Sequence, residues 1–332
     1  MKDQLARVIR GERLSEEEAS HVMETIMDGA ATPAQIGALL AALAVRGEAE
    51  DEVVGFARSM RARAVPVRAR EAVDTCGTGG DGAGTFNIST VASLVVAACG
   101  VRVAKHGNRS ASGACGSADV LEALGVRIDA PVETVQRSLD DVGWAFLFAP
   151  AFHASTRHAV GPRKELGVRT AFNLLGPLTN PAMPRAQLVG VPKRDLLEFV
   201  ARCLRRLGVE RAWVVHGPGL DEISLAGPTA VAALDDGGVR TFEVAPGDAG
   251  LPERDLGALR GGDAAESAEI VRAVLGGEAG PRRDVVLLNA AAALVVCGRA
   301  RDLREGARMA AEAIDDGRAA RLLANAVRAS LS

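Results

Sequence analysis

The stretch "DTCGTGGDGAGTFNIST" (residues 74–90) places five glycines between a predicted strand and a predicted helix. The segment "AVDTC" on its N-terminal side is short and apolar, which is typical of a buried strand. On its C-terminal side, "STVASLVVAACG" predicts a buried helix that ends at Gly100. In open α/β sheets, ligands bind at loops that follow the carboxyl ends of strands. The stretch therefore predicts an α/β fold and the place of its binding site.

Strands and helices continue to alternate after this stretch. The strands that we expect are "VRVAKHG" (101–107), "VRID" (126–129), "WAFLFAP" (144–150), "AQLVGVP" (186–192) and "RAWVVHGPG" (211–219). Residues 229–246 predict a short antiparallel excursion, and "DVVLLNA" (284–290) predicts a strand-like piece in a C-terminal part that is otherwise helical. Such alternation predicts a mainly parallel central sheet flanked by helices.

The first 65 residues or so contain helix signals and lack strand signals. Ser15 with Glu18 forms a capping-box pattern, and Thr32 precedes a helix that ends at Gly47. A second helical, proline-punctuated segment follows the strands, from about residue 151 to 184. We expect a small all-helical domain and a larger α/β domain, with these limits: 1–70 plus roughly 163–190 for the first, and 71–162 plus 191–332 for the second.

Composition and charge exclude several classes of protein. With 39 basic and 42 acidic residues among 332, the net charge is −3, which argues against general nucleic-acid binding. Aromatic residues make up only 3 %, so a base-stacking platform is not expected either. The five cysteines form no CxxC pair, which predicts a reducing, cytoplasmic location. The N-terminus lacks a signal-peptide core and the apolar stretches are too short to span a bilayer, so no membrane contact is expected.

Three alternative interpretations of the glycine stretch fit less well. "GTGGDG" (77–82) matches the GxGxxG pattern of dinucleotide-binding proteins, but the helix begins only near Ser89. The next strand ends in Lys105 and His106, where that fold needs an acidic residue. A Walker A loop requires a lysine where Ala83 stands, and a flexible linker would lack the apolar segments on both sides. These differences favour a phosphate site of another type.

The favoured interpretation is a cradle of backbone amides. Successive glycines allow N–H groups to point into one concavity, and the following helix adds a positive dipole end. Asn87, Ser89 and Thr90 stand at that helix end, where Ser89 could equally be a helix cap. Asp81 within the loop would repel a bare phosphate, so it indicates an accompanying metal ion or ligand hydroxyl.

Three further loops carry polar groups suited to the same ligand. "KHGNRSASGACGS" (105–117) combines basic, hydroxyl and small residues, and "HGPGLDEIS" (216–224) presents the adjacent acids Asp221 and Glu222. Two carboxylates with substrate phosphates are a common Mg²⁺ site, although a surface acid pair is often only solvated. Arg163 follows a proline at what we expect to be a helix start, where the dipole disfavours a cation. A carboxylate substrate would explain it, and a solvent-facing arginine on a helix is the alternative.

In this order and spacing, "DTCGTGGDGAGTFNIST", "KHGNRSASGACGSADVLEALG", "GPRKELGVRTAFNLLGPLTNP" and "VVHGPGLDEIS" resemble the anthranilate phosphoribosyltransferases of tryptophan biosynthesis. The resemblance covers nearly the whole chain. It implies a Mg²⁺-dependent pentosyltransferase with two bound ions, which acts on 5-phosphoribosyl-1-pyrophosphate (PRPP) and anthranilate. It also implies a homodimer built on the helical domain. Three departures are Gly113 in place of a second serine, "HAST" (153–156) in place of "HPAM", and Pro162 directly before Arg163.

The resemblance also implies site residues. Metal ligands would be Ser89, Asp221 and Glu222, and anthranilate would contact Gly77, Asn108 and Arg163. PRPP would contact Gly77, Gly80, Asp81, Thr85, Asn87, Ile88, Ser89, Thr90, Lys105, His106, Gly107, Asn108, Arg109, Ser110, Ala111, Ser112, Gly113 and Ser117.

The reaction requires mainly positioning and electrostatics. Departure of pyrophosphate leaves a cation-like ribosyl centre and a leaving group that gathers negative charge, which Mg²⁺, Lys105 and loop amides would stabilise. The anthranilate amine already has a free lone pair, so we expect no obligatory base; His106 would orient the aromatic acid or accept the late proton. The alternatives are a nucleoside phosphorylase of the same fold and a non-catalytic nucleic-acid-binding relative. A pyrophosphate-sized site with two metal carboxylates argues against the phosphorylase, and the acid pair together with the net charge argues against the nucleic-acid-binding relative.

Overall fold

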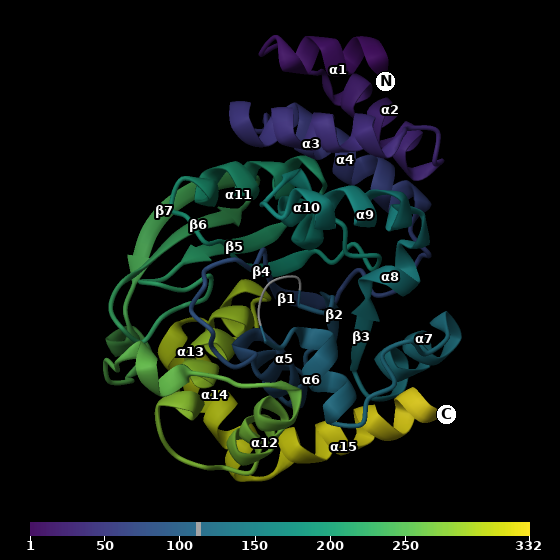
Figure 1. Cartoon of the computed structure of the whole chain (residues 1–332). Helices are drawn as coiled ribbons and strands as arrows, with labels where there is room; N and C mark the ends of the chain where they lie inside the picture. Colours follow the sequence, from purple (N-terminus) through teal and green to yellow (C-terminus); the bar gives the residue numbers. More distant parts are fainter. Residues whose placement is uncertain (111–113) are drawn as a thin grey trace.

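A seven-stranded sheet forms the centre of the larger part of the protein in the computed structural model, which describes residues 1–110 and 114–332 (Figure 1). The strand order is β3-β2-β1-β4-β5-β6-β7. The first five strands are parallel, whereas β6 and β7 are antiparallel to their neighbours. The strands are β1 (Val73–Gly77), β2 (Val103–Gly107), β3 (Trp144–Phe148), β4 (Ala186–Gly190), β5 (Arg211–His216), β6 (Thr229–Asp235) and β7 (Gly238–Val244).

Both faces of the sheet are buried because side chains alternate between two cores. Leu188 and Val215 point into a core shared with helices α5 and α13, whereas Val189 and Val214 point into a core shared with α11. The expected fold class, a mainly parallel sheet flanked by helices, is confirmed. The helices of this part are α5 (Ile88–Ala98), α6 (Ser117–Ala123), α7 (Val132–Asp141), α11 (Leu196–Arg206), α12 (Ala264–Leu275), α13 (Pro281–Val296), α14 (Leu303–Asp315) and α15 (Arg318–Leu331).

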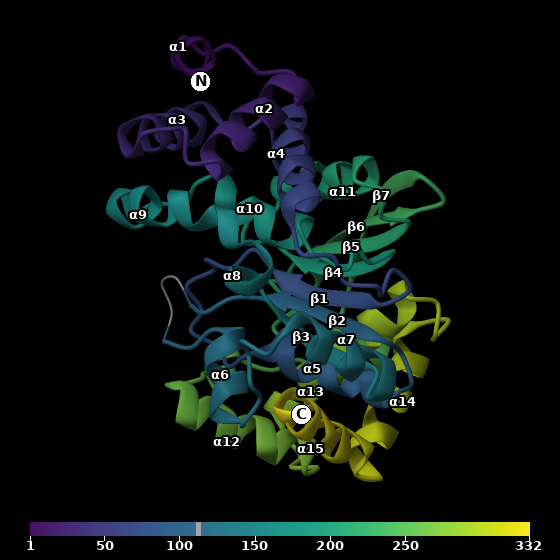
Figure 2. The ribbon, with the colours of Figure 1, turned by 90° about the vertical axis from the view of Figure 1, so that its right-hand side faces the viewer.

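A helical part stands beyond the α11 side of the sheet, and both views show its helix α10 between α3 and the strands (Figures 1 and 2). The predicted capping boxes are present, with Ser15 accepting from the Glu18 amide and Thr32 accepting from the Gln35 amide. Helix α9 packs on α3, and α10 packs on α4. The helices are α1 (Lys2–Ile9), α2 (Glu16–Met27), α3 (Pro33–Arg46), α4 (Glu50–Arg63), α9 (Arg157–Leu166) and α10 (Ala171–Leu178). The short helix α8 (Ala149–Phe152) follows β3 and packs on that strand.

The division into two domains remains our proposal, with one limit adjusted. Strand β4 pairs with β1 and β5 in the central sheet, so the segment that returns to the helical part ends before Ala186. Within the described residues, no helix is both long and apolar enough to cross a membrane.

Two of the expected strands are wrong. Residues 126–129 form a loop, because β3 pairs directly with β2 and forms the edge of the sheet; Val126 and Ile128 are buried as core side chains of that loop. Residues 284–290 belong to helix α13. That helix is buried on almost all sides, so its sequence lacks the polar face that distinguishes a helix from a buried strand.

Candidate active site

The loops after β1, β2 and β5 meet at the carboxyl edge of the parallel strands. The Gly79 amide donates to Asp221 Oδ2 at 2.8 Å, which joins the glycine loop to the loop after β5. Asn87 Nδ2, at the end of the glycine loop, donates to the Cys115 carbonyl at 3.1 Å, which joins the glycine loop to the loop after β2. The structure therefore brings together three of the segments that the sequence singled out.

Asp221 lies close against two glycines of neighbouring strands. A Cβ atom on Gly190 would lie 1.5 Å from the Asp221 carbonyl oxygen, and one on Gly77 would lie 2.6 Å from Asp221 Oδ2. Gly190 therefore leaves room for the backbone of Asp221, and Gly77 leaves room for its carboxylate. The chain just beyond is held by Asn289, whose Oδ1 accepts from the Ile223 amide at 3.0 Å.

Burial and neighbouring charge disfavour the ionised form of the two carboxylates of this site. Burial, reinforced by the neighbouring Asp81, raises the pKa of Asp221. Burial also raises the pKa of Glu222, with the charge of Asp221 as the next cause, while Lys105 acts in the opposite direction. Concentrated negative charge with little solvent favours a bound cation.

Lys105 supplies buried positive charge behind the acids. Its side chain is 1 % exposed, and Nζ donates to the Thr75 carbonyl at 2.6 Å and to Ser89 Oγ at 3.4 Å. Burial lowers the pKa of Lys105, whereas the charges of Asp74 and Glu222 raise it. The ammonium thus compensates the acids and holds Ser89 in place.

His106 is buried as a neutral ring. Its Nδ1 lies 3.0 Å from the Gly176 carbonyl, which can only accept, so the proton is assigned to Nδ1. Burial lowers the pKa of His106 to about 3, and the His153 ring lies 5.4 Å away between centroids. Nε2 is buried and has no hydrogen-bond partner among the described residues, so the neutral ring keeps an acceptor nitrogen for a hydrogen bond.

The glycine loop is braced by Asp81. Its Oδ1 accepts from the Ala83 amide at 3.1 Å and its Oδ2 from the Asp221 amide at 3.2 Å. Beyond it, Thr85 forms a bridge with Arg260. These contacts fix the loop between the end of β1 and the start of α5.

Helix α5 begins at Ile88 with Asn87 as its N-cap residue, so the expectation that Ser89 could cap this helix is wrong. Ser89 and Thr90 lie within the first turn instead. The Thr90 hydroxyl is buried without a partner among the described residues. The first turn therefore follows the glycine loop at the same edge of the sheet, with Ser89 in contact with Lys105 and the Thr90 side chain buried.

The loop after β2 is described on both sides of residues 111–113. The predicted contacts Ala111, Ser112 and Gly113 lie outside the described residues. Asn108 Oδ1 accepts from the Arg109 amide at 2.7 Å, Gly107 ends β2, and Ser117 begins α6.

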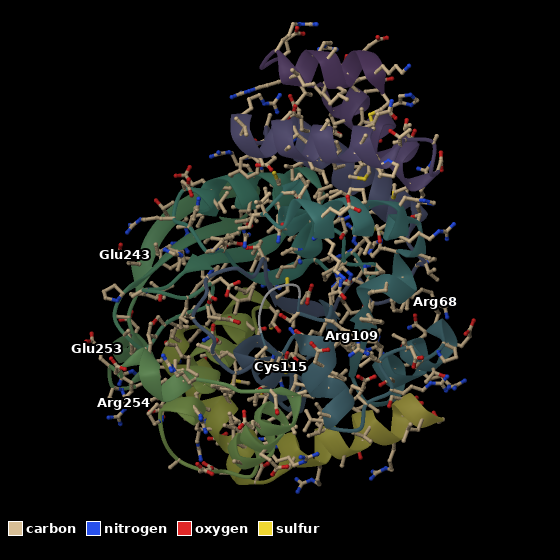
Figure 3. All side chains as sticks on the ribbon, viewed as in Figure 1. Arg68, Arg109, Cys115, Glu243, Glu253 and Arg254 are labelled. Carbon is tan, nitrogen blue, oxygen red and sulfur yellow. The ribbon has the colours of Figure 1, made fainter. Side chains whose placement is uncertain are left out.

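Arg109 is held by helix α6. Asp119 accepts from the Ser110 amide at 3.1 Å and from Arg109 Nη1 at 2.9 Å, and Glu122 also binds that guanidinium. The side chain of Arg109 is labelled in Figure 3. The charge of Arg109 is therefore already neutralised by two acids of α6.

Arg163 is placed differently from the expectation. It lies in the last turn of α9 and follows Pro162 inside that helix, so the argument from a helix start is wrong: the dipole favours a cation there. Its guanidinium lies over the Phe172 ring at 4.9 Å, and burial lowers its pKa. Within the described residues it forms no ion pair, which leaves its charge available to a ligand carboxylate.

Several residues that position the site were missed from the sequence. Asp74 is fully buried and accepts from the His106 amide at 3.2 Å and from Asn180 Nδ2 at 2.8 Å. The "TNP" segment that contains Asn180 had no assigned role, although a buried acid within a strand was a signal that it needed a partner. Arg169, next to Thr170, donates to the Gly79 carbonyl and was also missed.

No metal cage is built from protein side chains alone. Within residues 1–110 and 114–332, no three His, Cys, Asp or Glu side chains are grouped so that they could hold a metal ion. Mg²⁺ is usually bound through one or two carboxylates plus substrate phosphates. Asp221, Glu222 and the Ser89 hydroxyl fit that second type of site, because they supply hard oxygen atoms beside an amide-rich loop.

Comparisons with known proteins agree along the whole chain. Residues 2–64 match the helical bundle domain of a glycosyl transferase family, and residues 69–320 match its a/b domain. The chain is 57 % identical over 323 residues to an anthranilate phosphoribosyltransferase of Moorella thermoacetica, with 96 % of this chain and 95 % of that protein covered.

Solved structures give the same result. The anthranilate phosphoribosyltransferase of Thermus thermophilus has a TM-score of 0.94 and 45 % identity, with 99 % of each chain covered. The enzyme of Saccharomyces cerevisiae in complex with PRPP and Mg has a TM-score of 0.88 and 27 % identity, and the match covers 100 % of this chain and 99 % of that one.

Proposed function

The chain belongs to the anthranilate phosphoribosyltransferase family, and from this premise we propose how its residues perform the reaction. The 5-phosphoribosyl group of PRPP is transferred to the amine of anthranilate, and pyrophosphate is released, in tryptophan biosynthesis. The observation that carries the assignment of the site is the contact between Asp221 and the Gly79 amide, because it sets a carboxylate directly beside the phosphate cradle.

Asp221, Glu222 and Ser89 are the proposed ligands of Mg²⁺, and we propose two ions. A yeast relative has been solved with PRPP and Mg. When bound, the metal neutralises charge on the pyrophosphate leaving group. The raised pKa values of both carboxyls support the assignment, since a divalent cation would relieve their repulsion.

The remaining residues bind and orient PRPP. The predicted positions from Gly77 to Thr90 and from Lys105 to Ser117 stay as proposed contacts; amides of the glycine loop and the first turn of α5 face the phosphates in this proposal. Lys105 is buried, so we propose that it does not contact PRPP directly. It affects the ligand through its hydrogen bond to Ser89. His106 stays as the proposed residue that orients the aromatic acid or accepts the late proton from the new C–N bond. Its lowered pKa disfavours protonation of the ring, so it supports the orienting role, in which Nε2 accepts a hydrogen bond.

Gly77, Asn108 and Arg163 are the proposed contacts of anthranilate, with Arg163 binding its carboxylate. Arg163→Ala is expected to raise the anthranilate KM by about 10- to 100-fold, because a charge-assisted hydrogen bond contributes about 1.5–3 kcal/mol. The PRPP KM should change by less than about twofold. Steady-state kinetics with each substrate varied in turn measures both values.

Lys164→Ala is the matched control, since Lys164 is an exposed neighbour in the same turn of α9. Equal increases in both KM values for Arg163→Ala would contradict a carboxylate contact and indicate a general distortion of the site.

The loss of anthranilate fluorescence in the presence of PRPP and Mg²⁺ tests the function as a whole. Turnover that depends on all three components is the expected result. Phosphate-dependent cleavage of a nucleoside with no loss of anthranilate would instead indicate a phosphorylase, and binding of nucleic acid without turnover would indicate a non-catalytic relative.

We also propose a homodimer that is formed through the helical part. Ile9, Val45 and Val160 of α1, α3 and α9 are 64 %, 91 % and 57 % exposed, and such apolar groups are typical of an interface when they cluster. Sedimentation equilibrium is expected to give twice the chain mass of 34.3 kDa; a single species at the chain mass would contradict the dimer.

The five free cysteines support the proposed cytoplasmic location.

A further inference from the structure

Arg169 lies in the segment of residues 167–170 that connects α9 to α10. Gly167 ends α9 in the left-handed conformation, and Thr170 begins α10 by donating its amide to Asn173 Oδ1 at 3.0 Å. A cation just before a helix N-terminus is disfavoured by the dipole. The helix therefore gives no reason for an arginine at this position.

The guanidinium of Arg169 lies against the glycine loop. Nη1 donates to the Gly79 carbonyl, and a Cβ atom on Gly80 would lie only 1.7 Å from the same nitrogen. Gly80 also has a φ of +86°, a conformation that other residues rarely adopt. Gly79 thus donates its amide to Asp221 and accepts from Arg169, so one residue of the loop links the acid to the guanidinium.

Three carboxylates act on Arg169 without pairing with it. Burial lowers the pKa of Arg169, whereas the charges of Asp221, Glu48 and Asp81 raise it. None of the three forms an ion pair with it within the part of the chain that the structure describes. Glu48 lies between α3 and α4, so the guanidinium stands between the helical part and the α/β part.

We propose that Arg169 is the resident counter-charge of the substrate-free active site: it holds the glycine loop by the Gly79 carbonyl and opposes metal binding at Asp221 until the phosphates of the substrate arrive. Arg169 is a positioning residue in this role. Its effect on the metal rests on the proposed function of Asp221 and Glu222. Its effect on the loop rests on the contacts of Gly79 and Gly80 alone.

Hydrogen exchange in the substrate-free protein tests the effect on the loop. In Arg169→Gln, amides of residues 78–84 are expected to exchange about tenfold faster than in the wild type, because the loop loses its contact with the connecting segment. PRPP with Mg²⁺ should remove the difference. Arg157→Gln is the control, since Arg157 is an exposed arginine at the start of α9. Equal exchange in Arg169→Gln and the wild type would overturn the proposal.

Binding of Mn²⁺ without PRPP, followed by electron paramagnetic resonance, tests the effect on charge. Arg169→Gln should bind Mn²⁺ about three- to tenfold more tightly, because a nearby positive charge has been removed. Arg169→Lys keeps the charge and should bind as the wild type does. A Mn²⁺ affinity that is unchanged in Arg169→Gln would overturn the counter-charge role. Absence of Mn²⁺ binding in every variant even with PRPP would instead contradict the proposed metal ligands, and hydrogen exchange would still decide the role of Arg169.

Discussion

The double variant Asp221→Asn with Glu222→Gln is expected to lose at least about 10³-fold in kcat/KM, since one lost electrostatic contact to developing charge typically costs about 10²–10³. The fold should survive. Burial and a neighbouring carboxylate, Asp81 for Asp221 and Asp221 for Glu222, raise the pKa of both carboxyls, and neutral isosteres remove that unfavourable interaction. The amide oxygen introduced at position 221 could still accept from the Gly79 amide. Glu222 also compensates the buried Lys105, so this gain is partly offset, although the charge of Asp74 still acts on that ammonium. We therefore expect a melting temperature close to that of the wild type.

Steady-state kinetics at saturating Mg²⁺ and thermal unfolding on the same samples measure the two effects. Asp235→Asn with Asp236→Asn is the matched control, since these adjacent, exposed acids lie at the end of β6 and in the turn that follows it. Activity near the wild-type level in the double variant would rule out the metal assignment. A large fall in melting temperature would show that the acids have a structural role instead.

The parallel core could be predicted because its signals are local. The segment "AVDTC" is a short apolar run before glycines, and β1 forms over Val73–Gly77 as expected. The predicted strand at 126–129 failed because buried loop residues are as apolar as strand residues, and only pairing distinguishes them. Residues 284–290 failed for a related reason: a helix that is buried all round has no amphipathic period.

Site residues could be predicted from the sequence where their type and spacing indicate a specific chemistry. Residues whose role depends on contacts made in the folded chain were harder to predict. The acid pair after β5 and the glycine loop both carry such signals, and the structure joins them through Gly79 and Asp221. The contact between Arg169 and Gly79 joins residues 90 positions apart, so no local pattern could indicate it. Arg163 shows the opposite case, because a proline before it suggested a helix start, whereas Pro162 lies within α9.

Lys105→Met is expected to destabilise the protein by about 3–5 kcal/mol near neutral pH, the usual range when one member of a buried charge group is removed. Lys105 is 1 % exposed, and its charge opposes the raised pKa values of Asp74 and Glu222. Methionine fills similar volume but leaves both carboxylates uncompensated. It also removes the hydrogen bond that holds Ser89, so activity should fall as well.

The destabilisation caused by Lys105→Met should increase with pH, because the buried acids that Lys105 compensates ionise as pH rises. An acid with a native pKa above its unfolded value binds protons on folding, so its contribution to stability falls as pH rises through that window. Loss of Lys105 raises the native pKa of Asp74 and Glu222 further. The pH range over which these acids lose stability as pH rises therefore extends to higher pH. The difference in unfolding midpoint between variant and wild type should therefore be larger at about pH 8 than at about pH 5. Lys193→Met, at an exposed position, is the control; an equal difference at both pH values would mean that Lys105 acts by packing and not by charge.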